Sequence, residues 1–356
     1  MNTKRVVIED VKHPRDEELL EAAEILRAGG LVAFPTETVY GLGANALNEE
    51  AAKKIYAAKG RPSDNPLIAH ISGENELRPL VSEIPEAGRK LMEAFWPGPL
   101  TIIFPKSEAV PYGTTGGLDT VAVRMPSDPV ANRLIALAGV PVAAPSANTS
   151  GRPSPTTADH VWEDMNGKIE MILDGGPVGI GVESTIVDVT GEVPMLLRPG
   201  AITMEMLEEL LGRVEMDPAI TGPMSPDMHP KAPGMKYRHY APKADMTLVE
   251  GETGAMAREI CRLAGESLAA GKRTGIVCTE ETRHLYPEEL QREARFFSMG
   301  ERSREETIAH NLYAVLREFD EVDVEQIFCE AFPDTELGQA IMNRLIKAAG
   351  HKIVKV

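Results

Sequence analysis

Apolar residues recur at helical and strand spacings over residues 1–212. Leu19, Leu20, Ala23 and Leu26 suit an amphipathic helix, and helices are predicted at 17–28, 49–58, 86–95 and 129–138. Short apolar runs predict strands at 6–8, 31–34, 67–71, 100–104, 121–124, 142–144, 169–173, 185–189 and 195–198. Because strands and helices are interspersed, this region is predicted to form one α/β domain.

Residues 213–242 have a different character, with six prolines and little periodic apolar pattern. Proline restricts the backbone, so this stretch is predicted to be a stiff, extended linker. Beyond it, residues 243–356 are predicted to hold strands at 246–249 and 275–278 and helices at 255–270, 304–317 and 339–349. A strand–helix–strand order favours a parallel sheet with right-handed crossovers, and therefore a second domain.

Charge and composition limit the classes of function. The 356 residues carry a formal net charge of −17, whereas proteins that bind nucleic-acid backbones need clustered Lys and Arg. Stable nucleic-acid binding is therefore disfavoured, although the net charge leaves room for a local basic cleft.

The cysteines and the apolar runs bear on location. Cys261, Cys278 and Cys329 are an odd set without a Cys-x-x-Cys pair, which favours reduced, buried thiols. The N-terminal apolar run is too short for a signal peptide, and no stretch approaches the roughly 20 apolar residues of a membrane span. We expect a cytoplasmic protein without a membrane segment.

Several common catalytic motifs are missing. The sequence has no G-x-x-x-x-G-K-[ST] phosphate loop, no H-E-x-x-H zinc helix and no G-x-S-x-G nucleophile elbow, and its eight histidines are scattered, so no protein-held metal is expected. Residues 41–46 fit G-x-G-x-x-A, with Asp64 about 20 residues further on, as in a dinucleotide fold. Asp64 lies in a turn-rich loop rather than at a strand end, so the dinucleotide interpretation is disfavoured.

Polar residues instead gather in turn-rich places, where side chains seldom serve a core. Residues 35–43 leave a buried strand with two hydroxyls and a carboxylate near Thr38. Lys59 and Arg61 lie two residues apart at a helix end. A cap that complements the helix dipole would explain them, but together with the hydroxyl-rich loops they predict a phosphate clamp.

Further candidates follow later strands. Arg124 ends an apolar strand, where it would either form a structural ion pair or bind a substrate carboxylate. Loops 144–151 and 179–185 offer hydroxyls and backbone N–H groups, as ordinary Ser/Asn turns or as phosphate contacts. Taken together, these elements predict one site assembled from strand ends of an open α/β sheet.

Several of these segments resemble the YrdC-like domain family. In chain order they are Lys59-Gly60-Arg61-Pro62 with Asn65-Pro66-Leu67, Phe95-Trp96-Pro97-Gly98-Pro99-Leu100-Thr101, Ser146-Ala147-Asn148 and Glu183-Ser184-Thr185-Ile186. Residues 232–242, APGMKYRHYAP, resemble the linker of the two-domain form of threonylcarbamoyl-AMP synthase. The resemblance implies a twisted open mixed sheet at 1–212, a proline-rich linker at 213–242 and a smaller Rossmann-like α/β domain at 243–356.

The resemblance also implies roles for individual residues. Those expected around L-threonine are Thr38, His70, Arg124, Ala144 and Ser184, with Arg124 on the carboxylate. Those expected on the ATP side are Lys59, Arg61, Asn65, Thr120, Ser146, Asn148, Ser154, Arg198 and Tyr237. Lys59 and Arg61 are also the expected catalytic residues. The linker around Tyr237 would either fold over the nucleotide or serve only as a tether.

The implied reaction joins L-threonine, bicarbonate or CO2 and ATP into threonylcarbamoyl-AMP for tRNA modification, with pyrophosphate as the second product. Mg2+ would arrive with the ATP, no organic cofactor is expected, and downstream threonylcarbamoyl-transfer proteins would be the partners. Two alternatives stay open: a carbamoyl adenylate made for another pathway, and an RNA-binding module. The sequence leaves the role of the C-terminal domain, the oligomeric state and the fate of the adenylate undetermined.

Overall fold

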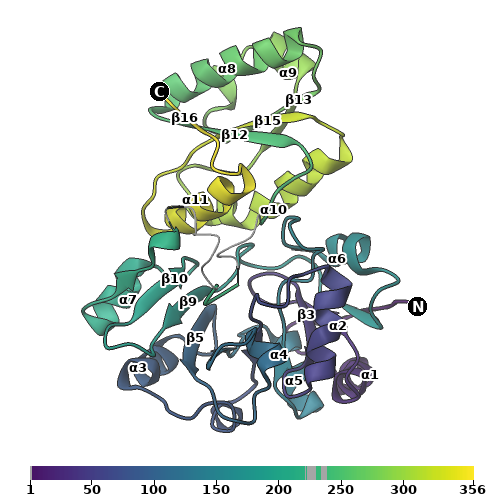
Figure 1. Cartoon of the computed structure of the whole chain (residues 1–356). Coiled ribbons are helices and arrows are strands. Elements are labelled where there is room, and N and C mark those ends of the chain that lie inside the picture. Colours follow the sequence, from purple (N-terminus) through teal and green to yellow (C-terminus); the bar gives the residue numbers. More distant parts are fainter. Residues whose placement is uncertain (1, 221, 223–229, 234–238) are drawn as a thin grey trace. The chain divides into compact units, whose positions relative to one another are not determined.

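The computed structural model describes residues 2–220, 222, 230–233 and 239–356. The chain divides into two compact units (Figure 1). The first comprises Met1–Ser150 and Ser154–Tyr237, and the second comprises Gly151–Pro153 and Arg238–Val356. None of the described helices is both long and apolar enough to cross a membrane.

Eleven strands of the described chain form one sheet in the first unit, in the order β1-β8-β2-β3-β7-β4-β6-β5-β9-β10-β11. Parallel pairs such as β4 with β6 alternate with antiparallel pairs such as β5 with β6, so the predicted open mixed sheet is confirmed. The strands are β1 (Lys4–Val7), β2 (Val32–Phe34), β3 (Gly41–Asn45), β4 (Ile68–His70), β5 (Leu100–Pro105), β6 (Thr120–Arg124), β7 (Val142–Ala143), β8 (Met171–Asp174), β9 (Thr185–Asp188), β10 (Met195–Arg198) and β11 (Glu215–Met216).

Helices cover this sheet on both faces. They are α1 (Asp16–Arg27), α2 (Glu49–Lys59), α3 (Glu86–Phe95), α4 (Tyr112–Thr115), α5 (Pro129–Ala138), α6 (Ala158–Met165) and α7 (Met204–Leu211), with 3-10 turns at Glu74–Glu76 and Pro218–Ile220. Successive side chains of a strand point to opposite faces. Accordingly Phe34 of β2 joins a core with Leu19 of α1 and Leu134 of α5, whereas the preceding Ala33 joins a second core with Ile55 of α2.

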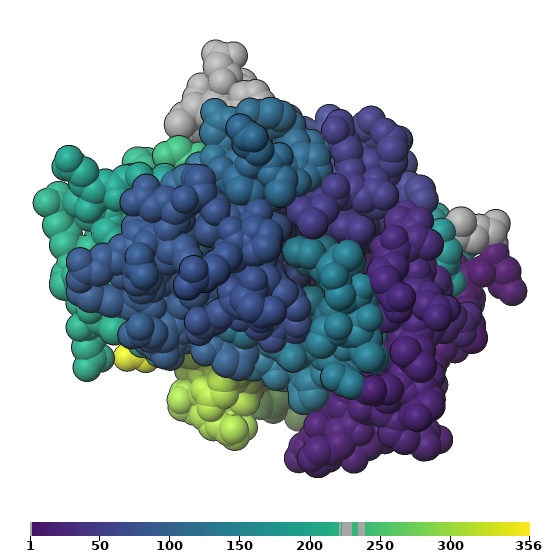
Figure 2. Space-filling model, turned by 90° about the horizontal axis from the view of Figure 1, so that it is seen from below, coloured from purple at the N-terminus to yellow at the C-terminus, as the bar shows by residue number. Residues whose placement is uncertain are grey.

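The packing of α1 on α5 brings distant parts of the sequence together. Their shared core is formed by aliphatic side chains that recur at helical spacing on each helix. Figure 2 shows this relationship from outside, where the purple beginning of the chain lies beside teal segments from further along the sequence. Of the four apolar residues predicted for this helix, Leu19, Ala23 and Leu26 are fully buried, whereas Leu20 is 43% exposed because it lies off their face of α1.

The second unit contains a five-stranded sheet in the order β14-β13-β15-β12-β16, and all its pairs are parallel. Figure 1 shows α8 and α9 on one face of this sheet and α10 and α11 on the other. The predicted Rossmann-like architecture is thus confirmed. Its elements are β12 (Asp245–Glu250), α8 (Thr253–Ala269), β13 (Thr274–Cys278), a 3-10 turn (Arg283–Leu285), α9 (Glu288–Glu293), β14 (Arg295–Ser298), α10 (Glu305–Glu321), β15 (Gln326–Glu330), α11 (Glu336–Ala348) and β16 (Ile353–Lys355).

Candidate functional site

Strand register places four polar residues in a row across the first sheet. His70 of β4 pairs with Arg124 of β6, and Arg124 pairs with Thr101 of β5. Ser184 directly precedes β9, whose first residue pairs with the neighbour of Thr101. Three of these residues, His70, Arg124 and Ser184, are predicted to surround L-threonine, and they come from three separate parts of the chain.

Arg124 lies at the centre of this row and is only 4% exposed. Its Nη1 donates to Thr38 Oγ1 at 2.9 Å, and its Nη2 lies 2.6 Å from Glu37 Oε1. Apart from this ion pair, the Nε and Nη2 atoms of Arg124 and both carboxylate oxygens of Glu37 make no hydrogen bond to the described residues. A buried guanidinium with unused donors is suited to bind a planar carboxylate.

The charges around Arg124 are set by burial and by Arg124 itself. Burial and the nearby guanidinium lower the pKa of His70 to about 3, so its ring is neutral near pH 7. Burial tends to raise the pKa of Glu37, but Arg124 and the nearby backbone N–H groups of Glu37 and Ser127 together outweigh it, so the pKa lies below its usual value. Burial raises the pKa of Asp128, at the start of α5, to about 6. Near pH 7 the neighbourhood of Arg124 thus holds the Glu37 carboxylate as its ion-pair partner and the neutral ring of His70.

Ser184 ends the row on one side, whereas Ala144 lies beside Ile68, two residues along β4 from His70. Ser184 Oγ lies 2.8 Å from Thr101 Oγ1 and accepts from Nη2 of Arg198 at 3.1 Å. The Nε atom of Arg198 donates to the backbone oxygen of Ser184 at 3.0 Å, which fixes the guanidinium beside the serine. Ala144 follows β7, and its N–H donates to the carbonyl of Ile68 at 2.9 Å.

On the predicted ATP side, Lys59 is the last residue of α2 and is 1% exposed. Gly60 ends the helix in the left-handed conformation, at φ 63°. The Lys59 ammonium donates to the backbone oxygens of Ser146 and of Asn148, the latter at 2.6 Å. Ser146 Oγ donates to Asn148 Oδ1 at 2.6 Å. One buried cation therefore fixes the loop after β7.

The remaining ATP-side residues lie around this loop and at the start of β4 and β6. Arg61 donates through Nη2 to the carbonyl of Pro66 at 3.0 Å, next to the buried Asn65, whose Oδ1 has no hydrogen-bond partner among the described residues. Ser154 Oγ donates to Glu183 Oε1 at 2.5 Å. Thr120 begins β6. Tyr237 lies outside the described residues.

The predicted site residues lie at both ends of the strands. Thr120 and Arg124 are the first and last residues of β6, and four steps at about 3.3 Å separate them by roughly 13 Å. Arg124 lies with His70 at one end, and Thr120 lies at the end of β6 where Asn65 leads into β4. A ligand that contacts both sets must therefore lie along the sheet, as a nucleotide joined to an amino acid would.

Comparison with known proteins assigns the family. A model described as telomere recombination (Sua5, YciO and YrdC) matches residues 24–200, and one described as the threonylcarbamoyl-AMP synthase C-terminal domain matches residues 202–350. The chain is 48% identical to the threonylcarbamoyl-AMP synthase of Bacillus subtilis over all of both chains. It is 51% identical to that of Pyrococcus abyssi, over 94% of this chain and 95% of the relative.

The chain belongs to the threonylcarbamoyl-AMP synthase family. A crystal structure of P. abyssi Sua5 in complex with L-threonine has a TM-score of 0.93 and 48% identity, and the match covers 99% of this chain and 100% of that one. The two-domain resemblance proposed from the linker and the motifs is therefore confirmed.

Sequence reasoning left three polar residues of this synthase-family site without a role. Glu37 contacts Arg124, Thr101 contacts Ser184, and Glu183 contacts Ser154. All three lie within segments that drew attention in the sequence, at 35–43, 95–101 and 183–186. What the sequence could not supply was the strand order that brings each one to its partner.

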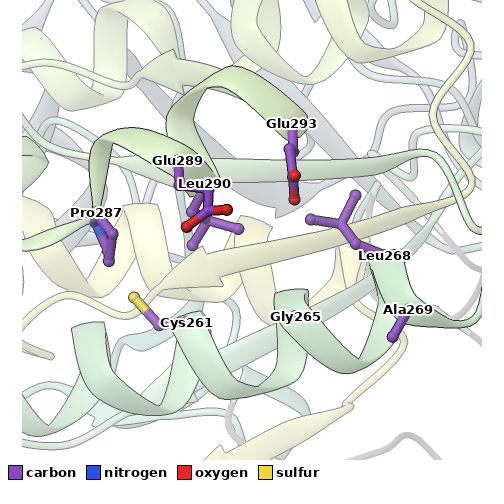
Figure 3. A pocket seen from close by; sticks show the side chains of 8 residues that line it. All are labelled: Cys261, Gly265, Leu268, Ala269, Pro287, Glu289, Leu290 and Glu293. Carbon is purple, nitrogen blue, oxygen red and sulfur yellow. The ribbon is translucent and has the colours of Figure 1, made fainter.

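A hollow of about 700 Å³ lies in the second unit, between α8 and α9 (Figure 3). Its lining includes Cys261, Leu290 and the carboxylates of Glu289 and Glu293. Burial raises the pKa of the Cys261 thiol, which disfavours the nucleophilic thiolate. Within the described ranges, no group of three or more His, Cys, Asp or Glu side chains is arranged to hold a metal ion.

Proposed function

We propose that this protein makes threonylcarbamoyl-AMP from L-threonine, bicarbonate or CO2, and ATP, and releases pyrophosphate. It is an enzyme of the nucleotidyltransferase type. The observation that carries the proposal is the buried Arg124, with unused donors, in a row with His70 and Ser184 in a chain whose full-length relatives bear the synthase name. The structure of one of these relatives was solved with L-threonine, which supports an amino-acid site here.

In this proposal, Arg124 binds the threonine carboxylate through two N–H groups, because a guanidinium matches a carboxylate in geometry and charge. Thr38 and Ser184 offer hydroxyls on either side of it. His70 is neutral and buried, so it adds a hydrogen-bonding ring without adding charge. Ala144 is small and leaves room for the substrate side chain.

ATP lies on the side of Lys59, Arg61 and Arg198, whose charges offset those of the triphosphate. Mg2+ enters with ATP as part of the substrate, because Mg2+ usually keeps several waters and is bound through substrate phosphates. Asn65, Thr120, Ser146, Asn148 and Ser154 line this side, and Tyr237 would complete it from the linker.

The reaction needs positioning and charge stabilisation rather than a protein nucleophile. The threonine amine and bicarbonate or CO2 give a carbamate, whose oxygen attacks the α-phosphorus of ATP while pyrophosphate leaves. Correct alignment alone can supply roughly 7–11 kcal/mol of the barrier reduction, and fixed cations at the developing phosphate charge add to it. Lys59 and Arg61 are the residues to which we assign this role.

The product would serve threonylcarbamoyladenosine formation in tRNA through separate transfer proteins. The net charge of −17 argues against stable binding of the tRNA by this chain itself. We also propose a cytoplasmic location, which the three free cysteines support.

The test is pyrophosphate release from ATP, Mg2+, L-threonine and bicarbonate, repeated with each component omitted, with the adenylate identified by mass spectrometry. We expect release to collapse without threonine and without bicarbonate. Release that is indifferent to threonine would instead support a carbamoyl adenylate for another pathway. No release by a folded protein, combined with a salt-dependent tRNA shift, would support an RNA-binding module.

A further inference from the structure

Glu37 is a largely buried carboxylate that forms an ion pair with Arg124, the residue expected to bind the substrate carboxylate. Its Oε1 lies 2.6 Å from Arg124 Nη2, and its side chain is 14% exposed. The backbone is fixed, because the oxygens of Glu37 and Thr38 accept the N–H groups of Ile180 and Gly181 at 2.8 and 3.0 Å. The backbone N–H groups of Glu37 and Ser127 help to lower the pKa of the carboxylate, but they make no well-aligned hydrogen bond to it. It therefore has free acceptor capacity inside the predicted threonine pocket.

The substrate brings one anion and one cation to this ion pair. L-Threonine enters as a zwitterion, and its carboxylate competes with Glu37 for Arg124. Its ammonium group is then the natural partner for the carboxylate that Arg124 has released. A pocket with one guanidinium and one carboxylate is thus complementary to the α-amino acid group as a whole.

The reaction also requires that a proton be removed. Threonine reacts as R–NH3+ + HCO3− → R–NH–COO− + H2O + H+. The N–C bond forms, a C–O bond of bicarbonate breaks, and two protons leave the nitrogen. One of them joins the departing hydroxide as water, and a base must take up the other. A positioned base must lie within hydrogen-bond reach of that nitrogen. We propose that Glu37 accepts this proton, after the substrate carboxylate has replaced it as the partner of Arg124. The inference rests on the proposed function.

The electrostatics of the pocket favour this sequence of events. Burial acts to raise the pKa of Glu37, and in the free protein Arg124 holds it down, with help from the nearby backbone N–H groups of Glu37 and Ser127. When the substrate carboxylate neutralises Arg124, the effect of burial remains, so the base becomes stronger only once threonine is bound. Protonation of Glu37 also removes its charge from the neighbourhood of the new, anionic carbamate.

The other titratable groups that face this position are less suitable bases. His70, on β4, is buried with a pKa lowered to about 3, and its Nδ1 lies 3.1 Å from the carbonyl of Ile68. Asp128, before α5, uses its carboxylate to cap that helix through the N–H of Ala131 at 2.9 Å. Arg124, on β6, is a charged guanidinium and cannot accept a proton. The Glu37 carboxylate instead faces Arg124, and the nearby N–H groups of Glu37 and Ser127 make no well-aligned hydrogen bond to it.

The test is the variant Glu37→Gln, which keeps the shape of the side chain and removes the basic carboxylate. Pyrophosphate release is measured from pH 6 to pH 10 with saturating MgATP and bicarbonate. We expect kcat to fall by about 10²- to 10⁴-fold near pH 7, the usual contribution of a general base. The rate of the variant should rise with pH, because free threonine amine forms in solution and needs no base. The dissociation constant for threonine, measured by calorimetry, should change by a much smaller factor than kcat.

Two matched variants serve as controls. Glu170→Gln changes another partly buried carboxylate of the same unit, which accepts the N–H of Leu31 at 2.8 Å, and the amide oxygen can keep that bond. We expect it to retain the wild-type pH profile. Glu37→Asp keeps a carboxylate base at a longer distance from the substrate nitrogen. We expect a rate between those of the wild type and Glu37→Gln, with a decrease at low pH where the carboxylate is protonated. This variant also tests the proposal if Glu37→Gln fails to fold.

Two outcomes would overturn the assignment. A Glu37→Gln variant with nearly wild-type kcat at pH 7 excludes Glu37 as the base. A variant that loses threonine binding and shows no recovery at high pH indicates that Glu37 only positions Arg124. Either result leaves the proposed function intact as long as the wild-type protein releases pyrophosphate in a threonine- and bicarbonate-dependent manner. Failure of the wild type in that assay rejects the proposed function instead.

Discussion

The Nζ atom of Lys59 lies 2.6 Å from the backbone oxygen of Asn148, and this contact joins the end of α2 to the loop after β7. The two residues are 89 positions apart in the chain. Because Lys59 is 1% exposed, the ammonium is held by the fold rather than by solvent. The same cation thus shapes the loop and, in the proposed function, offsets phosphate charge.

Lys59→Met should reduce both stability and activity. The substitution keeps the aliphatic stem but leaves the carbonyls of Ser146 and Asn148 without this donor, at a cost of about 1–3 kcal/mol for a buried polar group. We expect pyrophosphate release to fall by at least about 100-fold, the size of effect found when one fixed electrostatic donor is removed. Urea unfolding and the release assay measure the two effects separately. Nearly normal turnover in a folded Lys59→Met protein contradicts the clamp.

Arg61 should affect ATP more than threonine. Its guanidinium is oriented by the carbonyl of Pro66, and a planar fork contacts two phosphate oxygens where an ammonium contacts them as a point charge. We expect Arg61→Ala to raise the KM for ATP by at least about tenfold, and Arg61→Lys to recover only part of that loss. The exposed Arg89 on α3 provides the control variant Arg89→Ala, which should leave the KM unchanged. A selective effect on the KM for threonine would place Arg61 elsewhere.

Thr101→Val tests the row of residues across the sheet. Valine fills nearly the same volume, but it removes the hydroxyl that lies 2.8 Å from Ser184 Oγ. Loss of one neutral hydrogen bond, worth about 0.5–1.5 kcal/mol, should raise the KM for threonine by up to about tenfold and spare the KM for ATP. The control is Thr114→Val, which removes a buried hydroxyl bonded to Ala46 outside the row. Equal effects of the two variants on threonine would argue against the site.

Local periodicity predicted much of the fold, and its failures have physical causes. The helix predicted at 49–58 is α2, Glu49–Lys59. Strand β3 was missed, because its glycines read as a turn or a dinucleotide loop. At Gly43 an added Cβ would lie 2.7 Å from Phe34 Cε1, so glycine is there to let β3 pack beside Phe34 of β2. This reason is visible only when the two strands are paired.

The candidate site was predictable in its residues but not in its geometry. His70, Arg124 and Ser184 could be named from the family resemblance, although only Ser184 lies in one of the segments that carry it. Their alignment depends on the strand order β4-β6-β5-β9, which no local pattern of the sequence encodes. For the same reason Thr101, which lies between Arg124 and Ser184 in that order, had no assigned role before the structure.

His70 should make the stability of the protein fall in mild acid. Its pKa is about 3 in the folded protein, through burial and Arg124, against 6.5 when it is unperturbed. Below pH 6.5 the unfolded chain therefore takes up a proton that the folded chain refuses, so the free energy of unfolding falls as the pH drops from 6.5 towards 3. The slope approaches about 1.4 kcal/mol per pH unit.

Asp128 acts in the opposite direction within part of that range. Burial raises its folded pKa to about 6, from 3.8, so between these values the folded state binds the proton more readily and is stabilised as the pH falls. We therefore expect His70→Asn to flatten or reverse the acid loss of stability, and Asp128→Asn to steepen it. Urea unfolding of the three proteins at pH 4.5, 5.5 and 6.5 tests this, and parallel curves for wild type and His70→Asn contradict it.

The buried ion pair of the second unit should be strongly asymmetric in its response to mutation. Arg302 Nη2 lies 2.7 Å from Glu330 Oε2, and Tyr286 donates to Glu330 Oε1 at 2.7 Å. Glu330 is 1% exposed, so Arg302→Met leaves a buried carboxylate without its cation and should destabilise the unit by about 3–5 kcal/mol. Tyr286→Phe removes one charge-assisted hydrogen bond and should cost less, about 1.5–3 kcal/mol.

The double variant Arg302→Met with Glu330→Met decides whether the pair itself stabilises the unit. Removing both charges avoids the desolvation penalty, so most of the stability lost in Arg302→Met should return. Hydrogen exchange of the β13 and β15 amides in the full-length protein would report this unit separately from the other. If the double variant is as unstable as Arg302→Met, the loss comes from the other contacts of Arg302, and the explanation by the ion pair is wrong. These contacts are a hydrogen bond to the Ala331 carbonyl at 3.0 Å and the Phe332 ring, whose centroid lies 4.8 Å from the guanidinium carbon.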